Sequence, residues 1–429
     1  RMSFAFIVFL IIFILIFILK IPIPLGFFTA TAIYAYLSGF HLSIIAEKMV
    51  MGLYTKYILM AVPLFILTGN IMNTGKITEK IFKFANIIVG KFYGGMAHVN
   101  VVASIIFSGM TGSALADASG LGVMEIEAMR EQGYADNFSC AITAASATIG
   151  PIFPPSIPMV FYSMLSGASI GKLFLGGMIP GLLIGVALMI YIAFIAKKRN
   201  YPRGESYAFR KAIAITISSF PALLTPVILL GGIYTGVMTP TEAAAVAAFY
   251  SLIISILFYR SIGKKELINI FINTLKMTGK ISIIVATSFG ICFVITNERI
   301  PNFIAEWLIN ITNNKYVFLF IINIAFIILG MFINVNTITL VFIPIVLPLI
   351  ETLGIDLVHF GVVVVLNMMI GLSTPPYGGL LFVTSGISGT PIKSIMKEMF
   401  PMLLVMYAVL FLITYIPQIV LFIPNLFHF

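Results

Sequence analysis

Residues 148–156 read Thr-Ile-Gly-Pro-Ile-Phe-Pro-Pro-Ser, and residues 371–377 read Gly-Leu-Ser-Thr-Pro-Pro-Tyr. The glycine and the adjacent prolines of the first stretch recur 221 residues later in the second. The same spacing relates Gly109-Met110 to Gly330-Met331, Ile149 to Ile370, Phe161 to Phe382 and Pro180 to Pro401. One constant spacing across separate features is typical of internal duplication. The sequence therefore predicts two homologous halves, roughly 57–196 and 281–423, joined by a central pair of helices.

The composition predicts that the chain lies in a membrane. Hydrophobic residues make up 60% of the 429 residues and charged residues only 9%, and a soluble fold of this size could not bury so much apolar surface. Apolar runs such as 4–19 and 173–196 approach the roughly 20 residues that cross a bilayer. The net charge of +10 fits cytoplasmic loops that touch anionic lipid, and not nucleic-acid binding. The two cysteines and four scattered histidines offer no transition-metal site.

The distribution of basic residues predicts that the two halves are inverted. Segment 197–211 is the most basic of the chain, so the positive-inside rule places it in the cytoplasm. Helix 57–73 is followed by lysines, so its end is placed in the cytoplasm. When the chain is followed across the membrane from segment 197–211, the counterpart helix 281–296 ends on the outside. This topology places 19 of the 25 Lys and Arg residues on the cytoplasmic side. Inverted halves are a transporter architecture.

Each half contains a broken segment that enters and leaves on one side. Residues 96–129 are interrupted at 108–113 and residues 316–350 at 330–336, and the arms are too short to cross the bilayer. We therefore expect an all-α polytopic protein with two re-entrant hairpins and discontinuous helices. The expected organisation is 1–56 N-terminal scaffold helices, 57–95 a scaffold helix and a cytoplasmic-side arm, 96–170 the first transport hairpin and broken helix, 171–315 scaffold helices and an interfacial arm, 316–390 the second transport hairpin and broken helix, and 391–429 a C-terminal scaffold helix.

The breaks predict an ion site. Proline removes an amide donor and frees the carbonyl four residues earlier, and hydrocarbon tolerates a free carbonyl only where something binds it. Sodium suits unwound backbone together with Ser, Thr and Asn oxygens, and half-helix N-termini favour an anionic substrate group. The expected sodium-binding residues are Ser108, Gly109, Gly112, Ser113, Thr148, Gly150, Gly330, Asn334, Asn336, Thr337, Gly371 and Thr374. The expected substrate-binding residues are Ser113, Ser156, Asn336, Thr337, Ser373 and Tyr377. The alternative is that these small residues and prolines only permit close packing and kinks.

The positions of the acidic residues favour sodium over the proton as the driving ion. Two long stretches, 137–204 and 357–397, contain no carboxylate, whereas proton-coupled carriers place a titratable group near the midplane. Asp117 is interpreted as a helix-surface or packing residue, with a functional role as the alternative. Glu125, Glu127, Arg130 and Glu131 are interpreted as the cytoplasmic flank of the first hairpin.

Two further motifs are interpreted as structural. Thr239-Pro240-Thr241-Glu242 precedes an Ala-rich run and predicts a capping box with proline at the first helical position. The amphipathic run 264–280 is expected to lie along the membrane surface as a bracing arm.

Several long motifs resemble one transporter family. They are 63–72 (Pro-Leu-Phe-Ile-Leu-Thr-Gly-Asn-Ile-Met), 94–101 (Gly-Gly-Met-Ala-His-Val-Asn-Val), 113–117 (Ser-Ala-Leu-Ala-Asp), 148–158, 231–245 and the region from Thr374 to Gly378. These motifs are similar to those of the large membrane subunit of tripartite ATP-independent periplasmic (TRAP) transporters. The resemblance covers nearly the whole chain.

The resemblance implies a sodium-driven secondary transporter of elevator type in the bacterial inner membrane, and not an enzyme. It also implies that the sodium sites lie where the hairpin tips face the broken loops, here 108–113 with 148–151 and 330–337 with 371–374. It implies two partners, a small four-helix membrane subunit that is sometimes fused ahead of this one and a periplasmic solute-binding protein. Arg1 is interpreted as a tag remnant or as the continuation of such a fusion. The substrate is an organic acid, with sialic acid slightly favoured over a C4-dicarboxylate because the expected midplane is polar but uncharged. A stand-alone sodium/dicarboxylate symporter is the first alternative, and an intramembrane enzyme or lipid flippase is a remote one.

Overall fold

The structure is a computed structural model that describes residues 3–73, 75–204, 207–304 and 314–427. Within these ranges every element is helical, and the only β-type pairing is an isolated bridge between Tyr93 and Arg203. Seven of the described helices are long and apolar enough to span a membrane, or eight if a bent pair is one span. That pair is α3 (Leu42–Tyr54) with η1 (Tyr57–Met60) and α4 (Ala61–Met72), which bend by 66°. Arg1 lies outside the described residues.

The first half runs from η1 and α4 through six further elements to one long helix. Its members are α5 (Gly75–Val89), α6 (Gly95–Thr111), α7 (Ala114–Ser119), α8 (Leu121–Glu131), α9 (Asp136–Ala147), α10 (Ile157–Ser166) and α11 (Ile170–Lys198). The second half contains α16 (Lys315–Phe332), α17 (Val335–Thr352), α18 (Leu357–Gly371), α19 (Gly379–Ser388), α20 (Ile392–Tyr415) and α21 (Pro417–Leu426). Between them lie α12 (Phe209–Tyr234), α13 (Pro240–Ile253) with the π-helical turn η2 (Ile254–Phe258), and α14 (Lys264–Asn297). The N-terminal pair is α1 (Phe4–Ile18) and α2 (Ile23–Leu37).

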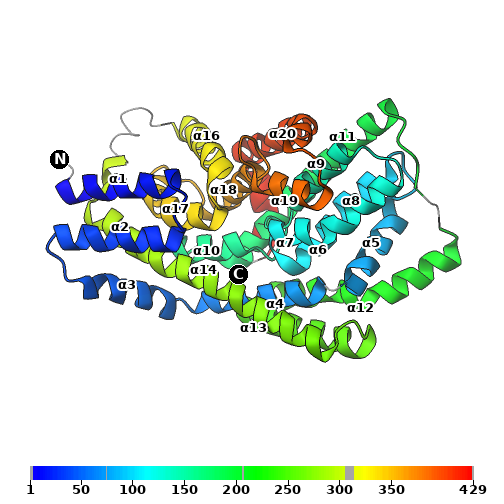
Figure 1. Ribbon diagram of the computed structural model, residues 1–429, viewed down its shortest axis with the longest axis horizontal. Helices are drawn as coiled ribbons and strands as arrows, with labels where there is room; N and C mark the ends of the chain where they lie inside the picture. The colour runs from blue at the N-terminus through cyan, green and yellow to red at the C-terminus, as the bar shows by residue number, and fades with distance from the viewer. Residues whose placement is uncertain (1–2, 74, 205–206, 305–313, 428–429) are drawn as a thin grey trace.

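The two halves repeat one plan and pack reciprocally (Figure 1). In each, a helical hairpin (α6 with α7–α8, or α16–α17) is followed by a broken helix (α9–α10, or α18–α19) and a long helix (α11, or α20). The C-terminal part of each broken helix packs on the second arm of the other half's hairpin, α10 on α17 and α19 on α7. Likewise α9 packs on α20 and α11 on α18. The predicted repeat is therefore present in the fold.

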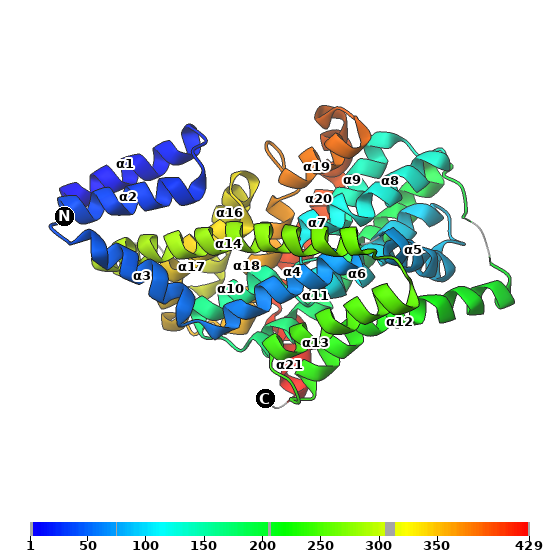
Figure 2. The ribbon, with the colours of Figure 1, turned by 60° about the horizontal axis from the view of Figure 1, so that its bottom comes forward.

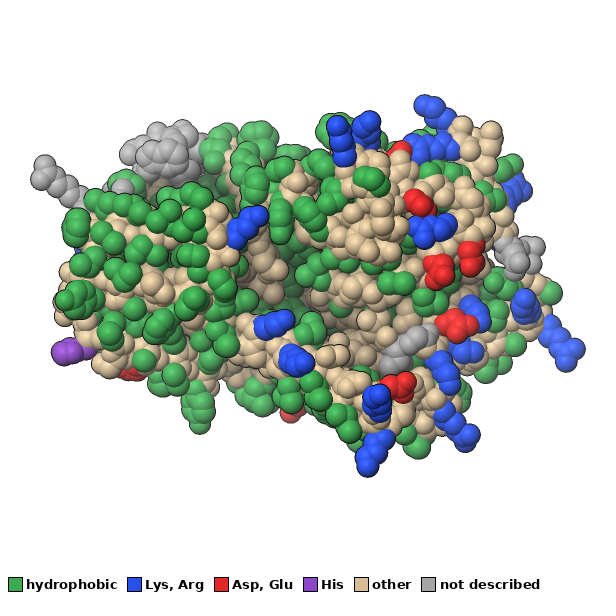
Figure 3. Space-filling model, viewed as in Figure 1, with side chains coloured by type: hydrophobic (Ala, Val, Ile, Leu, Met, Phe, Trp, Pro, Cys, Tyr) green, Lys and Arg blue, Asp and Glu red, His purple; other side chains and the backbone are tan. Residues whose placement is uncertain are grey.

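The repeat-related helices α11 and α20 run in opposite directions side by side. Arg199, the C-cap of α11, forms an ion pair of 2.9 Å with Glu398 in the second turn of α20. Near them Arg130 Nη2 donates to the carbonyl of Ser388, which ends α19, at 3.1 Å. The basic side chains on the face of Figure 3 gather over this end of the molecule, around α5, α8 and α12. Antiparallel partners with basic loops at one end are what inversion requires.

A buried polar contact ties the hairpin to the broken helix in each half. Ser146 on α9 donates to Asn100 Oδ1 on α6 at 2.7 Å. Asn367, which lies 221 residues after Ser146, donates to Asn323 Oδ1 on α16 at 2.9 Å. A buried hydrogen bond that is broken leaves an unpaired polar group at a cost of about 1–3 kcal/mol. These contacts therefore fix each hairpin to its own broken helix.

Helix α14 contains the run expected to form a surface arm. Residues 264–280 continue without a break into residues 281–297 of the same helix, and their place at the membrane surface stays a prediction. Helix α14 packs against α2, α3, α4 and α17 and runs along the molecule (Figure 2). At its C-terminal end Asn297 donates to the Tyr34 hydroxyl at 2.7 Å, and Glu298 accepts hydrogen bonds from Tyr34 and Ser3. The capping box at Thr239 and Glu242 is present as predicted.

Cysteine labelling tests the sidedness of the inverted fold. Val237→Cys and Thr352→Cys should react with an impermeant reagent from the periplasmic side, and Ala208→Cys and Lys393→Cys should not. All four side chains are exposed, and none is a glycine in the left-handed region. Gly204 is unsuitable because a Cβ there would lie 2.5 Å from the carbonyl oxygen of Gly90. The measurement is mass-shift labelling of intact cells, with the parent chain as the background for Cys140 and Cys292. Reaction of all four from one side would contradict the inversion.

Candidate functional site

The first hairpin turns at a glycine in the left-handed conformation. Helix α6 ends at Thr111, Gly112 follows with φ of 60°, and the extended Ser113 caps α7 by accepting from the amide of Ala116 at 3.4 Å. A Cβ on Gly112 would lie 2.6 Å from the carbonyl oxygen of Pro155. The hairpin tip therefore rests directly on the first broken loop, as the sequence predicted.

The first broken loop replaces helix by tight turns. After α9, the amides of Ile152 and Phe153 both donate to the carbonyl of Ile149, at 3.0 and 2.9 Å. Ser156 then caps α10 by accepting from the amide of Met159 at 3.2 Å. The Cβ position of Gly150 lies 3.5 Å from the Ala114 nitrogen of the hairpin tip. The loop and the tip are thus in van der Waals contact.

The second hairpin repeats this arrangement with a closer backbone crossing. Asn334 caps α17, where its Oδ1 accepts from the amide of Asn336 at 3.0 Å. Gly330 near the end of α16 crosses Gly371 at the end of α18, and a Cβ on Gly371 would lie 2.8 Å from the Gly330 Cα. Only glycine at both positions allows this approach.

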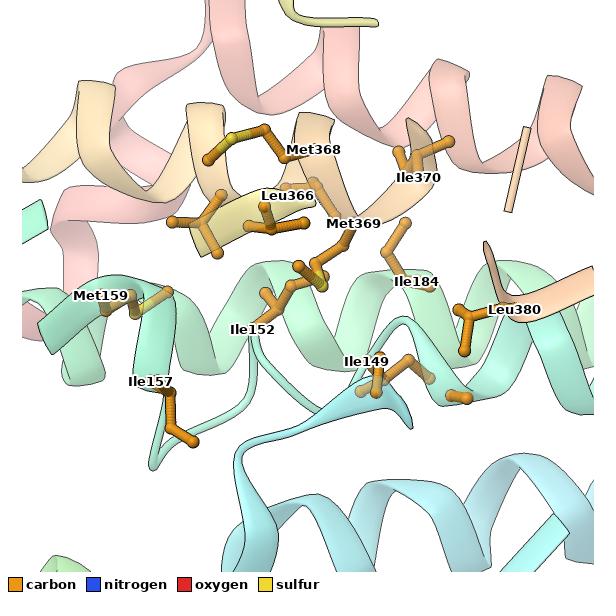
Figure 4. Packing of buried hydrophobic residues seen from close by; sticks show 14 of the residues in the cluster. Ile149, Ile152, Ile157, Met159, Ile184, Leu366, Met368, Met369, Ile370 and Leu380 are labelled. Carbon is orange, nitrogen blue, oxygen red and sulfur yellow. The ribbon is translucent and has the colours of Figure 1, made fainter. Parts of the chain in front are cut away.

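The two breaks adjoin each other inside the core. Ser373 in the second break donates to the carbonyl of Ala144 on α9 at 3.1 Å. Ile149 and Ile152 of the first loop belong to the same buried cluster as Met369 and Ile370 of α18 (Figure 4). Both breaks therefore belong to one packed unit that contains backbone from each half.

A cavity of about 470 Å³ lies where both hairpin tips meet α4 and α14. Four predicted site residues line it, namely Gly112 and Ser113 from the first tip and Asn334 and Asn336 from the second. The other predicted site residues are outside its lining: Ser108, Gly109, Thr148, Gly150, Ser156, Gly330, Thr337, Gly371, Ser373, Thr374 and Tyr377. This volume falls in the range of ordinary small-molecule sites.

Among the residues outside the cavity, the side chains of several predicted ligands are already engaged. The hydroxyls of Ser108 and Thr148 donate to carbonyls of their own helices, each at 2.6 Å. Thr374 bonds to the carbonyl of Ile370 and to the hydroxyl of Tyr407. Tyr377 is 53% exposed and packs on the ring of Phe382. The structure does not bring Tyr377 to the expected substrate site.

Two buried hydroxyls at the hairpin tips have no hydrogen-bond partner among the described residues. They belong to Thr111 at the end of α6 and Thr337 in the first turn of α17. A buried polar atom without a partner is costly unless a ligand satisfies it. A sodium ion is coordinated by such hydroxyl oxygens together with backbone carbonyl oxygens. The residues at both tips therefore fit a sodium ion.

The cavity also contains residues that sequence reasoning missed. Lys280 of α14 is the one charged side chain among the described lining residues, and Asn70 and Asn73 of α4 lie across from it. Asn70 also donates to the Thr274 hydroxyl at 2.9 Å, which joins α4 to α14. Lys280 was assigned to the surface arm because lysines precede it in the sequence. Only the unbroken course of α14 reveals that it faces the hairpin tips.

The structure also corrects the interpretation of Glu125, which does not lie on an exposed flank because it is 1% exposed. Asp117 is 1% exposed as well, which excludes a helix-surface position and agrees with a packing position. Glu127, Arg130 and Glu131, expected on the same flank, are exposed as predicted. The core of the first hairpin therefore contains carboxyl groups. A carboxylate-free core can no longer be used as an argument for sodium over the proton as the driving ion.

Comparison with known proteins gives the family. The model of the tripartite ATP-independent periplasmic transporter, DctM component, matches residues 6–419. The chain belongs to the DctM family. This DctM-family chain is 41% identical over 409 residues to the sialic acid TRAP transporter large permease protein SiaM of Vibrio cholerae, covering 94% of this chain and 95% of SiaM. It is 38% identical over 369 residues to the C4-dicarboxylate TRAP transporter large permease protein DctM of Pseudomonas aeruginosa, covering 86% of each. The predicted family, and the prediction of a transporter and not an enzyme, are confirmed.

The fold of the DctM-family chain also matches a solved transporter structure. The YdaH transporter of Alcanivorax borkumensis aligns with a TM-score of 0.66 over 87% of this chain and 88% of YdaH. The sequence identity is 12%, so the likeness concerns the fold. It supports an all-helical, polytopic transporter fold, as the sequence predicted.

The glycine crossing in the second half gives a stability prediction. Gly371→Ala should lower thermal stability and uptake, because its methyl group meets the Gly330 backbone and overpacking costs about 1–3 kcal/mol. Gly386→Ala on α19 is the matched control, since no atom lies within 4 Å of its Cβ position. The measurement is the melting temperature of the purified protein in detergent. Equal melting temperatures for the two variants would mean that the crossing is not constrained.

Proposed function

We propose that the chain is the large permease of a TRAP transporter of the bacterial inner membrane, and that it uses sodium to import a small organic carboxylate. The cavity carries this proposal. It is bounded by both hairpin tips and by α4 and α14, so a bound solute touches both halves of the repeat. A site at the interface of inverted halves is the arrangement of secondary transporters.

Lys280 is proposed to bind the carboxylate of the substrate. It is the one positive charge among the described residues that line the cavity, which also presents neutral amides from Asn70, Asn73 and Asn336. A single cation with several neutral hydrogen-bonding groups suits a polyhydroxylated monocarboxylate better than a dicarboxylate, whose second charge would lack a partner. We therefore favour sialic acid, the solute named for SiaM, over the C4-dicarboxylates named for DctM of Pseudomonas aeruginosa.

Sodium is proposed to bind at the two hairpin tips, next to the substrate. The unpaired hydroxyls of Thr111 and Thr337 and the carbonyls freed at the breaks are the expected ligands. An ion at each tip would fix the tip against its broken loop. Substrate bound beside these tips would then favour sodium binding, which is the reciprocal coupling that symport requires.

We further propose that the hairpins and broken helices move as one unit against the other helices, in an elevator cycle. The contacts between Gly330 and Gly371 and between Ser373 and Ala144 support a single body. The solute is proposed to arrive on a periplasmic binding protein, and the chain to assemble with a small four-helix membrane subunit. Uptake by proteoliposomes without the binding protein would instead favour a stand-alone symporter.

Removing the hydroxyl of Thr337 should weaken sodium binding. Thr337→Val keeps the shape of the side chain and should raise the half-saturating sodium concentration by roughly 5- to 150-fold, since a lost buried polar partner costs about 1–3 kcal/mol. Thr339→Val is the control on the same helix, because the Thr339 hydroxyl already donates to the carbonyl of Val335. The measurement is uptake against sodium concentration in proteoliposomes that contain the full system. Unchanged sodium dependence in Thr337→Val, or uptake driven by a pH gradient without sodium, would contradict the sodium assignment.

Neutralising Lys280 should weaken substrate binding and leave the half-saturating sodium concentration unchanged when substrate is saturating. Lys280→Gln should raise the half-saturating concentration of loaded binding protein by roughly 10-fold or more, since hydrogen bonds to charged groups contribute about 1.5–3 kcal/mol. Lys276→Gln, one turn earlier on α14 and outside the cavity lining, should behave like the parent. The assay compares sialic acid with succinate, each supplied on a binding protein specific for it. If Lys280→Gln and Lys276→Gln changed the half-saturating concentration of loaded binding protein equally, Lys280 would not be a substrate-binding residue.

A further inference from the structure

Two carboxyl groups lie inside the first hairpin without a cation. Asp117 on α7 and Glu125 on α8 are each 1% exposed. Both oxygens of Asp117 and Oε1 of Glu125 have no hydrogen-bond partner among the described residues. The hydroxyl of Ser104 on α6 lies next to both side chains, and the Asp117 charge acts on Glu125. The two acids therefore form one buried cluster.

The charges of the neighbouring helices do not compensate this cluster. The titratable side chains on the helices packed against α7 and α8 are His98 on α6, Glu127, Arg130 and Glu131 on α8, and Asp136 and Cys140 on α9, while α19 has none. Arg130, the one permanent cation among them, is exposed and pairs with Asp136 at 2.8 Å. Among the described residues no ion pair joins either acid to a cation. Two uncompensated anions in this position would be prohibitively costly.

Binding of a proton removes the cost of these two buried negative charges more readily than binding of a metal ion does. Sodium needs several oxygen ligands around it at once. The Ser104 hydroxyl donates its proton to Ser146 at 3.2 Å, so it can meet the two carboxyl groups only as an acceptor, which suits a protonated acid. A proton needs one carboxyl oxygen, and protonation turns the acid into a neutral group that can donate a hydrogen bond. Two carboxyl groups that share a low-dielectric site do not both ionise readily.

We propose that Asp117 on α7 and Glu125 on α8, together with Ser104 on α6, form a proton-binding site inside the first hairpin. At least one carboxyl group is protonated in the packed conformation seen here. The proton is a ligand of the moving unit and is distinct from the sodium ions proposed at the hairpin tips. Loss of the proton at alkaline pH leaves two buried anions, which loosens the hairpin and stops transport. Uptake therefore falls as the pH rises.

Infrared difference spectroscopy on the purified, full-length chain tests the proton directly and needs no substrate. We expect a protonated carboxyl C=O stretch at neutral pH that disappears on alkaline titration. The band should be reduced in Asp117→Asn or Glu125→Gln and retained in Glu127→Gln, which removes an exposed acid from the same helix. Absence of the band at neutral pH, or its persistence in both single variants and in the double variant, would overturn the proposal. Loss of the band on adding sodium chloride at constant pH would also overturn it, because sodium would then occupy the site.

Sodium-driven uptake gives a second readout that separates a proton site from a site for anionic carboxylates. Asn and Gln imitate the neutral acids, so Asp117→Asn with Glu125→Gln should keep uptake at neutral pH and lose its decline at alkaline pH. A variant that folds but shows no uptake at any pH, or a shifted half-saturating sodium concentration, would contradict the proposal. Failure of the sodium or substrate assignments would leave the infrared result unaffected, so the two proposals fail separately.

Discussion

The structure depends on one constraint, that backbone groups unpaired by a helix break cannot face hydrocarbon. Four breaks occur, two at hairpin tips and two in broken helices, and each is placed against another. Gly112 rests on the carbonyl of Pro155, and Gly330 crosses Gly371. Each tip therefore finds its surroundings in the broken loop of its own half. The reciprocal packing of α10 on α17 and of α19 on α7 joins the two halves.

This constraint also explains where function is located. The ends of the broken segments are the places where polar atoms are available inside a membrane, and the cavity forms where both tips meet α4 and α14. The hydroxyls of Ser108 and Thr148 donate their protons to carbonyls of their own helices. Hydroxyls that the helix leaves free, as at Thr111 and Thr337, are available to a ligand. The chemical difference between these groups lies in their orientation and not in their residue type.

Sequence alone predicted the repeat, its inversion and the pairing of tips with loops, because these depend on glycine, proline and charge, whose effects on the backbone are local. It could not predict that α14 is unbroken, since the polar run before Lys280 is equally compatible with a surface helix. The burial of Glu125 was missed for a related reason: three exposed charged residues follow it closely, and only the packing of α8 on α6 and α9 separates it from them. Likewise, sequence cannot distinguish the bonded hydroxyl of Ser108 from the free one of Thr111.

The unbroken course of α14 has a mechanical consequence. A helix of 34 residues is about 51 Å long, and it joins two distant parts of the protein. One end is hydrogen-bonded to α2 through Asn297 and Tyr34, while Lys280 in its middle forms part of the cavity wall. A stiff rod that tilts about its Asn297 end moves a point at Lys280, about 25 Å away, by roughly 0.4 Å for each degree. A displacement of the N-terminal helices would therefore be transmitted to the cavity wall through α14.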